Sequence, residues 1–247
     1  VERAITGLNE SVAFRQDTRT NLIPYSEDFS NASWNKINSS VAGGSVSPSG
    51  DLSAFKLVGD AVSSEKLLQT IRTVTNSAIY TASVFVKYGG VEWIRLTDAQ
   101  TSNRMHFNTL TGAFGTPTGT IIDYSSTAFA DGWHKVSITT TSVATAYAFR
   151  VTLAEADNDV AYTGDGTSGV YLWGAQLEEA SQATSYIYTN GAAVTVDSNS
   201  TSVVNNTGIV ERPITGVNES DALFPDNTES TVVNISDTII PLLTALE

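Results

Sequence analysis

The chain has 247 residues and a formal net charge of −13, with 26 acidic against 13 basic residues. This charge balance argues against a nucleic-acid binder or a protein of anionic membrane surfaces. The chain has no cysteine and only two histidines, which excludes disulfides, thiol nucleophiles and cysteine-ligated metals and leaves little room for a histidine-based metal site. No run of residues reaches the roughly 18 apolar positions that a membrane span requires.

A short segment at the start of the chain is repeated near its end. Residues 1–11 return as residues 210–220, with nine of eleven positions identical. We interpret this repeat as a connector that enters and leaves one module, or as two arms that dock onto equivalent sites of an assembly. The sequence therefore predicts an N-terminal arm at 1–20 and a C-terminal arm at 191–247. The apolar stretch 239–243 is either a docking segment for a neighbour or a strand packed on its own body.

Residues 21–190 carry the pattern of a folded β body. Apolar and polar residues alternate with period two, turn residues separate the runs, and serine and threonine make 60 of the 247 residues. Only 26–34 offers a short turn or helix. The pattern predicts an all-β, two-sheet antiparallel jelly-roll sandwich. The predicted strands are 79–88, 91–97, 133–141, 145–153 and 169–177, with weaker candidates at 54–58, 66–74, 104–108 and 120–124.

Three blocks of residues resemble a known module. Asn21–Trp34, Asp131–Ser137 and Tyr171–Glu178 resemble the opening, middle and close of a jelly-roll domain found in structural proteins of bacteriophages and prophages. That module is similar to carbohydrate-binding β-sandwiches and commonly sits in tail fibres and other virion appendages. The resemblance implies a virion protein on the particle surface or an appendage. Its partners would be other virion proteins, held through 1–20 and 191–247, and a host-surface glycan. By analogy with viral appendages it also implies a homo-oligomer, with a trimer favoured.

The alternation also predicts a ligand-binding surface. Glycan binding needs an aromatic ring for the apolar face of a sugar and polar groups for its hydroxyls. Four predicted strands each offer a mainly polar face that carries a basic or titratable residue. If these faces belong to one sheet, they form a basic surface with one tryptophan, suited to an acidic or neutral glycan. The alternative is an ordinary solvated sheet face. The candidate residues are Lys87, Trp93, Arg95, His106 and Arg150, whereas Trp34, Trp133 and Trp173 are interpreted as core.

A structural Ca²⁺ is the only cofactor that the sequence suggests. Asp157, Asp159 and Asp165 supply carboxylate oxygens at short spacing, although without the regular spacing of a known calcium loop. The alternative is a solvated acidic loop. Glu27, Asp28 and Glu178 form a second candidate cluster.

The sequence offers thin support for catalysis. It has neither a G-x-S-x-G nucleophile elbow nor a glycine-rich phosphate loop. The leading hypothesis is a non-catalytic attachment module of a virion fibre or appendage, with a glycan-binding sheet. The alternatives are a capsid decoration protein whose arms lash neighbouring subunits together, and a carbohydrate-active enzyme domain.

Overall fold

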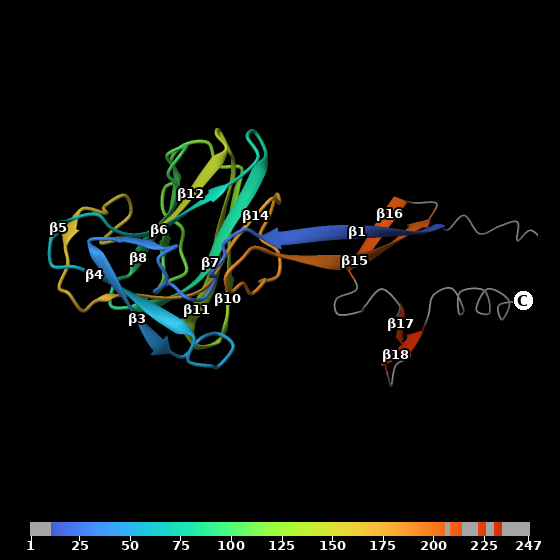
Figure 1. Cartoon of the computed structure of the whole chain (residues 1–247), viewed down its shortest axis with the longest axis horizontal. Coiled ribbons are helices and arrows are strands. Elements are labelled where there is room, and N and C mark those ends of the chain that lie inside the picture. The colour runs from blue at the N-terminus through green and yellow to red at the C-terminus, as the bar shows by residue number, and fades with distance from the viewer. Residues whose placement is uncertain (1–10, 206–207, 214–221, 226–229, 234–247) are drawn as a thin grey trace, which may run out of the picture. The chain divides into compact units, whose positions relative to one another are not determined.

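The computed structural model describes residues 11–205, 208–213, 222–225 and 230–233 (Figure 1). The chain divides into two compact units, and the larger one spans Thr20–Thr195, a few residues beyond the predicted 21–190. Apart from one 3-10 turn, η1 (Ala130–Gly132), the regular elements of the described residues are strands. None of the described residues form a helix long and apolar enough to cross a membrane.

Two antiparallel sheets build the larger unit, so the predicted all-β sandwich is confirmed. The six-stranded sheet has the order β10 (Asp123–Ala128), β11 (Trp133–Thr141), β7 (Ile79–Gly89), β14 (Gly169–Glu178), β4 (Ala54–Gly59) and β3 (Ser39–Ser45). The five-stranded sheet has the order β2 (Asn35–Ile37), β6 (Lys66–Thr73), β12 (Ala146–Ala154), β8 (Trp93–Asp98) and β9 (Asn103–Asn108). A short ribbon pairs β5 (Ser63–Ser64) with β13 (Tyr162–Thr163).

The main hydrophobic core lies between these two sheets, because alternate residues of each strand point inward. Ile94 and Leu96 of β8 and Phe107 of β9 are fully buried in it, as is Leu172 of the central strand β14. Burying each such side chain contributes about 1.5–3 kcal/mol to folding. The inward set on β8 is the one that the alternation predicts.

A second apolar cluster covers the other face of the six-stranded sheet. Phe85, Trp133 and Trp173 are buried there, with Tyr171 and Tyr186 packed against them. The rings of Phe85 and Trp173 meet edge to face with centroids 5.0 Å apart. The two tryptophans are therefore core residues, as predicted, but of this second cluster.

The entry segment of the larger unit is a series of turns, so the short helix considered for 26–34 is absent. The side chains of Asp28 and Asn31 accept hydrogen bonds from backbone N–H groups two residues further on, which competes with helix formation. Phe29 and Trp34 are buried in the main core, with ring centroids 5.1 Å apart. These two rings anchor the segment to the sandwich.

A single asparagine side chain ties this entry segment to the last strand of the sandwich. The amide of Asn21 donates to the carbonyls of Ala175 (3.0 Å) and Ile187 (2.9 Å). Its oxygen accepts from the backbone N–H groups of Ile23 (3.1 Å) and Leu177 (3.2 Å). Asn21 is fully buried, so all four bonds are shielded from water.

The flanking residues outside Thr20–Thr195 contribute to the smaller unit. A three-stranded sheet has the order β1 (Ser11–Asn21), β15 (Val194–Asn205) and β16 (Gly208–Pro213), and β17 (Ala222–Pro225) pairs with β18 (Ser230–Val233). The sequence predicts two separate extended arms, whereas the described parts of the two flanks pair with each other. The first copy of the repeat, apart from its last residue, the second copy beyond Pro213, and the stretch 239–243 lie outside the described residues.

Candidate ligand-binding face

The outer surface of the five-stranded sheet gathers most of the predicted site residues. Strand register places Arg95 of β8 directly beside His106 of β9 and Thr152 of β12. The adjacent row runs across four strands as Gln69, Arg150, Thr97 and Arg104. We call this surface the arginine face. It consists of Leu67, Gln69, Trp93, Arg95, Thr97, Arg104, His106, Arg150 and Thr152.

The prediction that Lys87 shares this surface is wrong. Lys87 lies on β7, which pairs with β11 and β14 in the six-stranded sheet. Phe85, two residues earlier, points to the same side of β7 and belongs to the second apolar cluster. Alternation along one strand gives the face of a residue but not the sheet to which its strand belongs, and β7 pairs only with strands distant in sequence.

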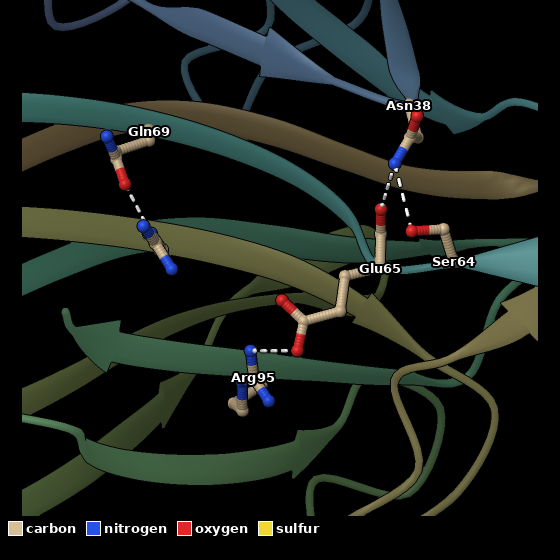
Figure 2. A network of polar contacts seen from close by, with 6 residues as sticks. Asn38, Ser64, Glu65, Gln69 and Arg95 are labelled. Atoms are coloured by element: carbon tan, nitrogen blue, oxygen red, sulfur yellow. Dashed lines mark hydrogen bonds and ion pairs between the residues drawn. The ribbon is translucent and has the colours of Figure 1, made fainter.

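An ion pair crosses the middle of the arginine face. Glu65, which precedes β6, accepts a hydrogen bond from the guanidinium of Arg95 at 3.2 Å, and Figure 2 shows the two side chains reaching toward each other. Because β12 lies between β6 and β8, this contact spans β12. The backbone of Glu65 is held in turn by Asn38, whose amide donates to its carbonyl at 2.9 Å (Figure 2).

The three guanidinium groups of the face lie close enough to repel one another. Burial lowers the pKa of Arg95, the carboxylate of Glu65 opposes that shift, and the charges of Arg104 and Arg150 lower it further. Arginine nevertheless stays protonated in proteins. Arg150 donates to the side-chain oxygen of Gln69. Within the described part of the chain, no acidic group forms an ion pair with Arg104 or Arg150.

His106 lies beneath this surface and does not contribute a charge to it. Its side chain is 1% exposed, and Asp157 covers it with a carboxylate oxygen 3.6 Å from Nδ1. Burial, followed by repulsion from Arg95, lowers the pKa of His106 to about 4, although Asp157 opposes the shift. His106 is therefore neutral at pH 7.

The loop that carries Asp157 is fastened over β9. Asp157 accepts hydrogen bonds from the backbone N–H (2.9 Å) and hydroxyl (2.8 Å) of Thr116. A Cβ atom at Gly115 would lie 2.3 Å from Oδ1 of Asp157, so a side chain at this position would require the carboxylate to shift. The loop therefore forms a wall along the β9 side of the face.

Buried polar atoms without a hydrogen-bond partner are concentrated on the arginine face. Five of the nine such atoms among the described residues lie here: Nε of Arg95, the hydroxyls of Thr97 and Thr152, and both ring nitrogens of His106. Buried polar groups in native proteins are almost always hydrogen-bonded, and leaving one unpaired costs about 1–3 kcal/mol. These five atoms lie beneath the surface, so a ligand on the arginine face could reach them only if neighbouring side chains moved.

Trp93 lies one step further along β8, opposite Asn108 of β9 and Ala154 of β12. It is half-buried. The structure thus places Trp93, Arg95, His106 and Arg150 on one sheet face, as the sequence predicts. The sequence does not identify Gln69 and Glu65, because each contacts an arginine on a different strand, and alternation along one strand does not show such contacts.

The structure does not bring the predicted calcium ligands together. In the part of the chain that it describes, no three acidic or histidine side chains are placed to hold a metal ion. Asp165 accepts hydrogen bonds from the backbone and hydroxyl of Ser168 and the backbone of Thr167, which lower its pKa. The oxygens of Asp165 are therefore occupied within their own turn. Oδ2 of Asp157 accepts from Thr116, and its Oδ1 accepts from the amide of Asn158. Asp159 is exposed, and its backbone closes the loop with Glu155.

The second candidate cluster for a metal is also dispersed. The carboxylate of Glu178 accepts from Gln176 (2.8 Å) and Thr184 (2.6 Å). Glu27 accepts from the hydroxyl of Tyr186, and Asp28 accepts from Ser30. These carboxylates stabilise local turns and the closing segment.

An aromatic pocket of about 510 Å³ opens on the other side of the sandwich, at the second apolar cluster. Phe85, Phe129, Trp173 and Tyr186 line it together with Lys135. Its rings pack against one another, with the centroids of Trp173 and Tyr186 4.7 Å apart. The Lys135 ammonium donates to the carbonyl of Thr184. This pocket is the alternative location for a ligand.

Comparison with solved structures finds weak similarity to two proteins that contain carbohydrate-binding modules. One is xylanase 10B of Clostridium thermocellum, a CBM22-1–GH10 pair of modules complexed with xylohexaose; the match covers 64% of this chain and only 27% of that one, with 12% identity and a TM-score of 0.35. The other is TmCBM27, a carbohydrate-binding module described for specific mannan recognition; the match covers 68% of this chain and 99% of that one, with 8% identity and a TM-score of 0.30. Similarity at this level carries no argument about a ligand. No protein-family model and no curated protein matches the chain.

Proposed function

We propose that the protein is a non-catalytic glycan-binding module and that the glycan lies on the arginine face. The observation that carries the proposal is the row of Gln69, Arg150, Thr97 and Arg104 on the same sheet face as the half-buried Trp93, with the row of Arg95 between them. Guanidinium and amide groups are the directed partners that sugar hydroxyls need, and an indole ring packs against the C–H face of a sugar.

Binding of the full chain to an array of neutral and acidic glycans tests the proposal. Trp93→Ala is expected to weaken binding at least tenfold, because the sugar loses its stacking surface. Phe129→Ala is the matched control, since Phe129 is 44% exposed and lines the aromatic pocket of the other sheet. Loss of binding in the Phe129 variant alone would move the site to that pocket. No binding to any glycan would refute the function.

The finer proposal is that this module serves attachment on a bacteriophage particle, as a homo-oligomer held through its flanks, with a trimer favoured. It is supported by the resemblance of Asn21–Trp34, Asp131–Ser137 and Tyr171–Glu178 to phage structural modules. Immunogold labelling of particles would locate the protein. Label on an appendage is expected, label spread over the capsid would favour decoration, and unlabelled particles would refute the virion role. Light scattering of the full chain tests the oligomer, and a monomer at micromolar concentration would contradict it.

A further inference from the structure

The charge distribution of the arginine face identifies the class of glycan, an inference that rests on the proposed function. Arg150, Thr97 and Arg104 are direct neighbours on the adjacent strands β12, β8 and β9. Neighbouring strands are about 4.8 Å apart, so the two arginine backbones are separated by about 10 Å with Thr97 between them. Two long side chains that flank one short one can converge on a single group above it.

Neither of these two guanidinium groups is matched by an acid of the described chain. Arg95, in the next row, already has Glu65 as its partner at 3.2 Å, whereas Arg150 has the neutral Gln69 and Arg104 has no ion-pair partner among the described residues. Asp157 is turned toward Thr116 and His106. This imbalance occurs on a chain of net charge −13, which otherwise has twice as many acids as bases.

A neutral sugar would not require such an arrangement. Amide and hydroxyl groups satisfy sugar hydroxyls, whereas paired arginines match the planar fork of a carboxylate or the oxygens of a sulfate. The short side chain of Thr97 lies between the two arginines in the strand register. Charge and fork geometry both indicate an anionic group.

We infer that the arginine face binds an acidic saccharide, with a sugar carboxylate held between Arg104 and Arg150 above Thr97 and a sugar ring against Trp93. Glu65 serves as the internal counter-ion of Arg95 and leaves the unmatched positive charge on Arg150 of β12 and Arg104 of β9. The ligand class is therefore a uronic-acid polymer rather than a neutral glucan, xylan or mannan.

The test uses the full chain and matched pairs of polymers. Polygalacturonate, alginate and hyaluronate are each compared with their carboxyl-reduced forms, which keep the sugar backbone but lose the charge. We expect at least one acidic polymer to bind at least tenfold more tightly than its reduced form, and that binding to weaken as salt is added. Poly-L-glutamate, which has carboxylates but no sugar, is expected to bind at least tenfold more weakly than that polymer.

Three variants test whether binding depends on the arginine face or on the overall charge of the protein. Arg104→Gln and Arg150→Gln are each expected to weaken binding to the acidic polymer about tenfold, a change typical of one lost charge-assisted contact. Lys87→Gln removes the same charge from the other sheet and is expected to change binding less than twofold. Thermal unfolding of each variant checks that the fold is retained.

Several outcomes would overturn the inference. Equal binding to an acidic polymer and its reduced form, with loss in Trp93→Ala, would leave the glycan proposal standing and remove the acidic class. If poly-L-glutamate binds as tightly as the acidic polysaccharide, the protein recognises negative charge and not a sugar. If Lys87→Gln weakens binding as much as the arginine variants do, the arginine face is not the site. Binding only to neutral glycans would also reject the acidic class, and binding to no glycan would reject the proposed function as well.

Discussion

Replacement of Asn21 by leucine should cost much of the stability of the sandwich. The side chain makes four hydrogen bonds of 2.9–3.2 Å to backbone groups, and it is fully buried. Asn21→Leu preserves the approximate shape but leaves two carbonyls and two N–H groups without partners. At about 1 kcal/mol for each lost bond, the free energy of unfolding should fall by about 4 kcal/mol. Stable domains have about 5–15 kcal/mol in total, so this is a large share.

Urea unfolding followed by tryptophan fluorescence measures the effect. With a slope of about 2 kcal/mol per molar urea, a loss of about 4 kcal/mol moves the midpoint down by about 2 M. Asn76→Leu is the control, because Asn76 is an exposed turn residue and surface changes of this kind stay within about 0.5 kcal/mol. A shift below about 0.5 M for the Asn21 variant would refute the view that this side chain fastens the entry segment to β14.

Three further predictions concern stability. The free energy of unfolding should fall as the pH drops from about 6.5 to about 4, because His106 binds a proton near pH 6.5 in the unfolded chain but only near pH 4 in the folded protein. In His106→Gln, the urea midpoint should therefore depend less on pH over this range. Gly169→Ala should lower the unfolding free energy by about 1–3 kcal/mol in thermal or urea melts, since its Cβ would overlap the backbone oxygen of Leu57; an unchanged melt would contradict this. Lys66→Met removes an ammonium that donates to three backbone carbonyls, so hydrogen exchange of the β5–β13 ribbon should accelerate while that of the core strands stays slow; unchanged exchange in the ribbon would count against the role.

Much of the sandwich follows from local sequence pattern. The predicted strand 133–141 matches β11, and 169–177 falls within β14, because alternating β-branched and aromatic residues bounded by Asp-Gly or Gly turns are strong strand signals. Strand β3 was missed, since Ser39–Ser45 contains two glycines and little apolar surface. It forms because β4 offers it a paired edge, which is a tertiary effect.

The candidate site could be predicted only in part. The alternation along β8 correctly predicts that Trp93 and Arg95 share a face, because successive side chains of a strand point to opposite sides. It failed for Lys87, whose sheet is decided by pairing over long sequence separations. It also gave no sign that Glu65 would cross β12 to reach Arg95, or that a loop would cover His106. Such contacts depend on side-chain reach and loop path, which have no periodic signature.

The pairing of the two flanks affects how the protein responds to mechanical load. β1 and β15 are neighbours, and the hydroxyls of Thr20 and Thr195 meet at 2.8 Å where the chain enters and leaves the sandwich. Tension applied through the two flanks would therefore act first on this strand pair and separate its hydrogen bonds one after another, with the eleven sandwich strands outside the path of the force. A module built in this way can lose the pairing of its flanks under strain while the two-sheet sandwich stays folded.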